Sequence, residues 1–144
     1  VVKENEKMYL IDYKSFHQKG TDAILDYLRY LRDKLQVNNI YSDVSHPFEN
    51  DVIEKAGFNV ERIAFNSYKE TGANVLANWF EKGLIKINRL NSELNALISQ
   101  LKEWKRDKSG HIIKKNDHFP DSLLCLTKAF WKPTNITIHP IVKY

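Results

Sequence analysis

The sequence predicts an α/β fold, in which a mixed sheet with an N-terminal antiparallel hairpin and later parallel strands is flanked by helices. The first observation is a pair of β-prone runs, residues 1–3 and 8–13, which lie on either side of a polar segment as in a hairpin. The second is that helix-periodic stretches alternate with short β-prone runs over the rest of the chain. The third is the order strand, long helix, strand over residues 8–43, which indicates a crossover and places the second strand parallel within the sheet.

The first helix is predicted over residues 21–36. Its apolar side chains, from Ile24 to Leu35, recur with the period of a helix, and Thr21 can cap its first turn. A short strand over residues 37–43 follows this helix. Asp43 therefore lies at the carboxyl end of a parallel strand, where open α/β sheets bind their ligands.

The remaining elements are bounded by glycines and capping residues. We expect a helix over 50–56 ended by Gly57, a strand over 59–65, a helix over 70–82 ended by Gly83, a strand over 84–87, and a helix that starts at a cap on Asn91 and carries its apolar stripe to Trp104. A turn over 107–110 precedes the last helix, which is predicted to run to about Trp131 and to stop before Pro133. Residues 133–144 form a β-prone tail.

The composition is that of an ordinary globular domain. The chain has 144 residues, 42% of them hydrophobic and 28% charged, with a formal net charge of +4. This mild basic excess permits a nucleic-acid partner without requiring one. The single cysteine, Cys125, excludes an internal disulfide and a cysteine-based zinc site. No apolar run is long enough to span a membrane, and no signal peptide opens the chain, so we expect no membrane partner.

Polar side chains gather at the start of the last predicted helix. Pro120 suits a first helical turn, and Asp117 can cap that turn. The spacing of Asp117, His118 and Asp121 allows all three side chains to meet on one helix face. An imidazole and two carboxylates are the groups that a divalent-metal or general-base site needs. The alternative is that Asp117 is only a cap and that His118 and Asp121 are solvated.

Several stretches, taken in order, resemble a known family. They are residues 40–47 around Asp43, residues 55–60, the strand 84–87, residues 93–101 with 103–110, and residues 116–118 with Asp121. This order is similar to that of the C-terminal nuclease domain of the large terminase subunit of tailed bacteriophages, over roughly residues 8–131. The resemblance implies a ribonuclease-H-like fold and a divalent-metal-dependent endonuclease that cuts concatemeric viral DNA during packaging. It implies double-stranded DNA, an upstream ATPase domain of the same polypeptide, the portal and the small terminase subunit as partners, and the cytoplasm of an infected bacterium as the location.

The resemblance assigns roles residue by residue. Asp43 matches the family's aspartate that ends a strand before a proline-containing turn. Asp121 matches the aspartate of the late helix, with His118 three residues before it and Asp117 as the preceding acid. The resemblance therefore implies Asp43, Asp121 and His118 as catalytic residues, and Asp43, Asp121 and Asp117 as ligands of a pair of Mg²⁺ or Mn²⁺ ions. Whether Asp117 is a ligand or a cap stays open, with the cap favoured.

One departure from the family concerns its first catalytic aspartate, which lies on an opening strand. The chain has no match to it, and Asp12 stands where the family has a non-catalytic acid. We therefore expect residues 1–144 to form a single nuclease-like domain that is a fragment without its first strand, with an incomplete metal site. The alternatives are a non-catalytic DNA-binding or motor-assembly module of the same fold, and another ribonuclease-H-like nuclease of the resolvase or integrase type.

Basic residues flank the predicted site. Those expected to contact DNA phosphates are Lys105, Arg106, Lys108, Lys114 and Lys115. Lys69, Lys82 and Lys102 could contact phosphates as well, and a solvated helix face explains most of these residues equally well.

Overall fold

The computed structural model describes residues 2–4, 7–16, 19–64, 66–113 and 118–130. The elements follow the order β1 (Val2–Glu4), β2 (Lys7–Leu10), α1 (Thr21–Leu35), β3 (Asn39–Asp43), α2 (Pro47–Lys55), β4 (Asn59–Ile63), α3 (Lys69–Glu81), β5 (Ile85–Ile87), α4 (Ser92–Glu103) and α5 (His118–Ala129). The predicted α/β class is confirmed, as is the antiparallel N-terminal hairpin, in which Val2 pairs with Tyr9.

The strands form two small sheets, and this differs from the single mixed sheet that the sequence predicts. One sheet has the order β1-β2-β5, with β2 and β5 parallel, and the other consists of the parallel pair β3-β4. The crossover from β2 through α1 therefore leads into the second sheet. The alternation of a strand and the period of a helix can be recognised within a few neighbouring residues. The choice of partner strand depends instead on how the helices pack between the sheets.

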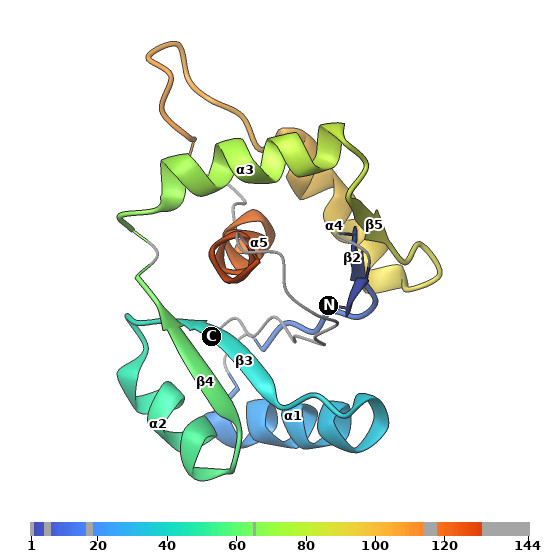
Figure 1. Ribbon diagram of the computed structural model, residues 1–144, viewed down its shortest axis with the longest axis vertical. Coiled ribbons are helices and arrows are strands. Elements are labelled where there is room, and N and C mark those ends of the chain that lie inside the picture. The colour runs from blue at the N-terminus through green and yellow to red at the C-terminus, as the bar shows by residue number, and fades with distance from the viewer. Residues whose placement is uncertain (1, 5–6, 17–18, 65, 114–117, 131–144) are drawn as a thin grey trace.

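Helix α5 occupies the middle of the molecule. Figure 1 shows it nearly end-on, with α3 on one side and the β3–β4 pair on the other, and it contacts α3, α4 and β3. Its Phe119, Leu123, Leu124 and Leu126 are almost fully buried. A helix that is apolar on most of its surface is stable only when it is surrounded by other elements. This explains why α5 separates the two sheets.

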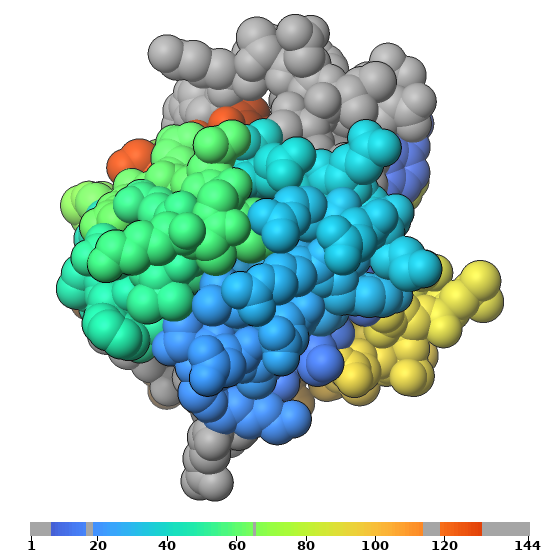
Figure 2. All heavy atoms as spheres, turned by 90° about the horizontal axis from the view of Figure 1, so that it is seen from below, coloured from blue at the N-terminus to red at the C-terminus, as the bar shows by residue number. Residues whose placement is uncertain are grey.

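A second core lies on the far side of the β3–β4 pair. It joins α1, α2 and β3 through Leu28, Ile40, Ile53 and Phe58. Figure 2 shows the outer face of α1 and α2, with the yellow segment that connects β5 to α4 projecting beyond them. The β3–β4 pair is thus covered by α5 on one face and by α1 and α2 on the other.

The helix ends test the predicted caps. Asn91 caps α4 as expected, because its side chain accepts a hydrogen bond from the backbone N–H of Leu94 at 3.0 Å. The cap on Thr21 was wrong, since Gly20 is the N-cap of α1 and makes no side-chain capping bond. Helix α2 begins at Pro47, three residues earlier than predicted. Asp117, Pro133 and the predicted tail lie outside the described residues.

Within the described residues, every helix is too short or too polar to cross a bilayer.

Candidate functional site

Asp121, in the first turn of α5, has a cationic partner on α3. The ammonium of Lys69 lies 2.9 Å from Asp121 Oδ1 and 3.2 Å from Oδ2. The side chains are 15% and 21% exposed respectively, so the pair is largely withdrawn from water. Lys69 is therefore not a solvated lysine, which was one of the two interpretations that the sequence left open for it.

Gly72 allows α3 to approach α5 closely enough for this pair to form. A β-carbon at Gly72 would lie 2.8 Å from Tyr68 Cε1 and 3.1 Å from Thr127 Oγ1. Thr127 is itself fully buried and donates its hydroxyl hydrogen to the carbonyl of Leu124 at 2.7 Å. The absence of a side chain at position 72 thus sets the spacing of the two helices, and Lys69, one turn earlier, reaches across to Asp121.

Asp43 ends β3 and organises the turn that follows. Its Oδ1 accepts a hydrogen bond from the backbone N–H of Ser45 at 3.0 Å, and its carbonyl accepts one from Asn50 Nδ2 at 2.9 Å. Asn50 is fully buried in α2, so this second bond ties the start of α2 to the strand end. The other carboxylate oxygen, Oδ2, makes no hydrogen bond with any residue that the structure describes.

The contact of Tyr41 shows which face of β3 carries Asp43. Side chains alternate along a strand, so Asp43 projects from the same face as Tyr41. The ring of Tyr41 lies 6.1 Å from that of Phe130, directly after α5. Asp43 is therefore on the face of β3 that α5 covers. Asp121 pairs with Lys69 on α3, the helix on the other side of α5, and no contact between described residues joins the two carboxylates. Asp121 precedes Phe130 by roughly 13 Å of helix length, at about 1.5 Å per residue.

Several predicted site residues cannot be placed. Asp117, Lys114 and Lys115 lie outside the described residues, and for His118 the structure describes the backbone at the start of α5 but not the side chain. In the described part of the chain, no three His, Cys, Asp or Glu side chains are grouped as a metal site would require. Asp43 and Asp121 fit a hard divalent cation in kind, because both supply carboxylate oxygens.

Three of the predicted DNA contacts belong to a loop after α4. Residues 105–113 form a small hairpin, here called the Arg106 hairpin, in which Arg106 pairs with Ile112 and the N–H of Ile113 bonds to the carbonyl of Lys105 at 3.0 Å. Gly110, at φ +83°, makes its tight turn. Lys105 and Lys108 are exposed on this hairpin.

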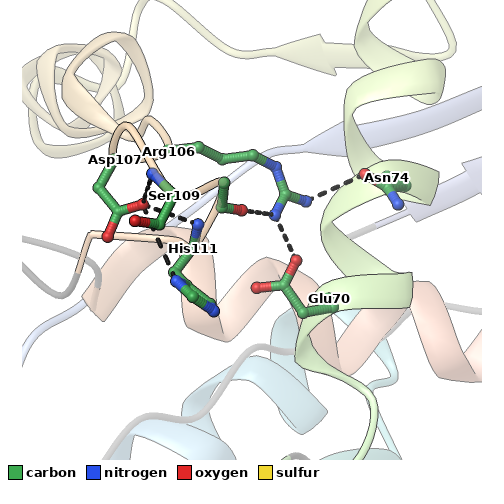
Figure 3. A network of polar contacts seen from close by, with 7 residues as sticks. Glu70, Asn74, Arg106, Asp107, Ser109 and His111 are labelled. Carbon is green, nitrogen blue, oxygen red and sulfur yellow. Dashed lines mark hydrogen bonds and ion pairs between the residues drawn. The ribbon is translucent and has the colours of Figure 1, made fainter.

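Arg106 itself is held by the protein (Figure 3). Its guanidinium is paired with Glu70 of α3, donates to the carbonyl of Gly110 at 2.7 Å, and donates to Asn74 Oδ1 at 3.1 Å. Glu70 and Asn74 are one turn apart on α3, so they present two acceptors to the planar guanidinium. Arg106 therefore anchors the hairpin to α3, which is a role that the sequence did not indicate.

Two carboxylates in this network have lowered pKa values. The hydrogen bond from Arg106 is the main cause of the lowered pKa of Glu70, and the backbone N–H of His111 is the main cause of the lowered pKa of Asp107. Figure 3 shows Asp107 within the turn, where it also accepts the N–H of Ser109 at 2.8 Å. Hydrogen bonds to a carboxylate favour its charged form, so both groups stabilise the hairpin when ionised.

Asp12, just after the end of β2, accepts three hydrogen bonds. Its Oδ1 accepts bonds from the N–H of Tyr13 at 2.9 Å and from Asn91 Nδ2 at 2.7 Å, and its Oδ2 accepts the Tyr27 hydroxyl at 2.8 Å. Burial and the hydrogen bond to Asp12 raise the pKa of Tyr27. Asp12 thereby connects the end of β2 with α1 and with the cap of α4.

Sequence reasoning missed Lys69, Gly72 and Asn50 as parts of this region. A glycine inside an otherwise helical pattern was the available signal for close helix packing at Gly72. Nothing local distinguishes Lys69 from the chain's other lysines, because its partner is 52 residues away.

Comparisons with protein-family models, with curated proteins and with solved structures gave no match to this chain.

Proposed function

We propose that this chain is a divalent-metal-dependent endonuclease domain of ribonuclease-H-like type, which cuts viral DNA during phage genome packaging. The observation that supports it best is the position of Asp43 at the end of β3 and of Asp121 in the first turn of α5, the helix that packs on this strand. The resemblance described above names the same two residues. The carboxyl end of a parallel strand is also where α/β folds place their chemistry.

The proposed roles follow from the contacts. Asp43, with Oδ1 occupied by Ser45, would offer Oδ2 to a cation, and Asp121 would offer a carboxylate whose geometry is set by Lys69. Bound Mg²⁺ or Mn²⁺ would supply charge neutralisation at the phosphate and an activated water. Lys69 places a positive charge beside Asp121, which suits a site that receives a phosphodiester. The exposed lysines of the Arg106 hairpin would contact the DNA backbone.

Metal binding is the direct test of this proposal. Titration of Mn²⁺ into the protein should show saturable binding that weakens at least about tenfold in Asp43→Asn and in Asp121→Asn, equivalent to about 1.4 kcal/mol. Asp33→Asn is the matched control, because it removes an exposed carboxylate from α1. Nicking of supercoiled plasmid in Mn²⁺ should follow the same order. Mn²⁺ binding that is absent, or that is equal in all variants, would overturn the assignment.

The second candidate function is a non-catalytic DNA-binding or assembly module. The observation in its favour is that Lys69 already neutralises Asp121, so that the carboxylate has a structural partner without a metal. This alternative predicts that duplex DNA binds in the presence of a metal chelator and that Mn²⁺ is not taken up. The two candidates therefore separate in the titration.

A further inference from the structure

A groove that includes neither Asp43 nor Asp121 lies between α3, β5 and α4. Its volume is about 650 Å³, within the range of sites that hold a peptide side-chain cluster or a small ligand. The floor is apolar, and its members are Ala77, Phe80, Ile85, Ile87, Ile98, Leu101 and Trp104. A hollow of this size with a mostly apolar lining is a candidate binding site.

The charge around this groove has one sign. Its charged lining residues are Lys86, Arg89 and Lys102, and none of the acidic side chains that the structure describes lines it. Lys86 and Lys102 are exposed, as is Arg89. A purely apolar partner would gain nothing from these cations, whereas a partner with carboxylates beside its apolar side chains would match both features.

Strand β5 presents backbone hydrogen-bonding groups along one side of the groove. The carbonyl of Leu84 accepts a hydrogen bond from the N–H of Met8 at 2.7 Å. The N–H of Asn88 donates to the carbonyl of Leu10 at 2.9 Å, so both residues bond to β2. Backbone groups alternate along a strand, so those of Ile85 and Ile87 point away from β2, toward the other edge. Within the described residues β5 has β2 as its one neighbour. An unpaired strand edge of this kind accepts an extended segment.

Trp104 contributes an unused donor. Its indole N–H is buried and has no hydrogen-bond acceptor in the part of the chain that the structure describes. Buried donors are nearly always paired, and an unpaired one is a reason to look for a missing partner. Because Trp104 also lines the groove, a carbonyl or carboxylate of a bound segment is a candidate acceptor for this N–H.

From these observations we infer that the groove between α3, β5 and α4 binds an extended peptide segment of a partner protein in which apolar and acidic residues alternate. The segment adds to the free edge of β5, its apolar side chains fill the floor, and its carboxylates pair with Lys86, Arg89 and Lys102. This site is independent of the proposed nuclease chemistry.

The probe is a fluorescein-labelled peptide of alternating leucine and glutamate, with the same peptide carrying lysine in place of glutamate as its counterpart. We expect saturable binding of the glutamate peptide by anisotropy and no binding of the lysine peptide. The double variant Lys86→Glu with Lys102→Glu should weaken the affinity at least about fivefold, since each rim pair contributes a modest amount. Lys34→Glu, an exposed charge reversal on α1, should leave the affinity within about twofold.

The tryptophans give a second, local readout. Binding should change the tryptophan fluorescence of the protein and of Trp79→Phe, but not that of Trp104→Phe, which keeps the apolar ring and removes the indole donor. Trp79 is a suitable control because it is partly buried against the same core and does not line the groove.

Three results would overturn the inference. They are absence of saturable binding by the glutamate peptide, equal binding of the lysine peptide, and equal affinity in the Lys86→Glu/Lys102→Glu and Lys34→Glu proteins. Binding of laurate at this groove without binding of the glutamate peptide would also overturn it, because the occupant would then be a small amphiphile.

Discussion

Lys69 and Asp121 are 52 residues apart in the sequence, and their side chains meet at 2.9 Å between the start of α3 and the first turn of α5. This pair places the carboxylate that we propose as a metal ligand. Because α5 lies between the two sheets, the pair also links the outer helix α3 to the centre of the molecule.

Replacing Lys69 by methionine should destabilise the fold by about 1–3 kcal/mol, because a largely buried carboxylate loses its charged partner. Urea unfolding measures the change. Adding Asp121→Asn to Lys69→Met should recover part of the loss, since the carboxylate charge is then gone, and Asp121→Asn alone should also destabilise. If the loss of stability in the double variant equals the sum of the losses in Lys69→Met and Asp121→Asn, the two side chains are not energetically coupled. Under the proposed function, Lys69→Met should also raise the Mn²⁺ affinity, because the ammonium no longer competes with the ion for Asp121.

Gly72→Ala should destabilise the protein by about 1–3 kcal/mol, because the new methyl group would overpack against Tyr68 and Thr127. The sign is informative, since glycine to alanine in a helix interior ordinarily stabilises by roughly 0.5–1 kcal/mol. Asn78→Ala, at an exposed position of the same helix, is the control and should change stability by less than about 0.5 kcal/mol. Thermal unfolding of the two variants would contradict the packing argument if Gly72→Ala were the more stable.

Combined replacement of Lys105 and Lys108 by alanine should reduce the slope of log affinity for duplex DNA against log salt by roughly 2, since each phosphate contact contributes about 0.9. Both lysines are exposed on the Arg106 hairpin, so the fold should be unaffected. Lys34→Ala with Lys55→Ala removes the same charge from α1 and α2 and should leave the slope unchanged. An unchanged slope in the hairpin variant would exclude the hairpin from the DNA interface.

The Arg106 hairpin should loosen in acid. The pKa of Glu70 is lowered from its ordinary value of 4.5, chiefly by the hydrogen bond from Arg106. A carboxylate with a lowered folded-state pKa stabilises above its unfolded pKa, and that stabilisation is lost as the pH falls through the folded pKa. The amide signals of residues 105–113 should therefore shift as the pH falls below 4.5. Glu70→Gln should remove the contribution of Glu70 to this transition and leave that of Asp107. Identical pH titrations of the amide signals in the two proteins would contradict the role of Glu70.

Much of the secondary structure follows from local patterns. The hairpin of β1 and β2, the cap of α4 by Asn91 and the ends of α2 and α3 at Gly57 and Gly83 were all predicted, because the signals lie within a few residues of each feature. The cap at Gly20 was missed, since Thr21 offers a stronger capping side chain than the glycine that is used.

The candidate site was predicted only in part. The strand-end position of Asp43 and the first-turn position of Asp121 follow from the sequence pattern. The partner of Asp121 does not, and neither does the anchoring of Arg106 by Glu70, because each pair joins residues more than 30 positions apart. The sequence shows that Asp121 and Arg106 are charged, but it does not show which residue of opposite charge lies beside each of them.

The sequence by itself determined the α/β class, the positions of its helices and strands, and the two aspartates that end a strand and begin a helix, because backbone preference and apolar period act over one or two turns. The tertiary structure decided which strands pair, how α5 divides them into two sheets, and which cation faces Asp121. These depend on the packing of segments that are distant along the chain, and a small residue such as Gly72 changes that packing through space rather than along the sequence.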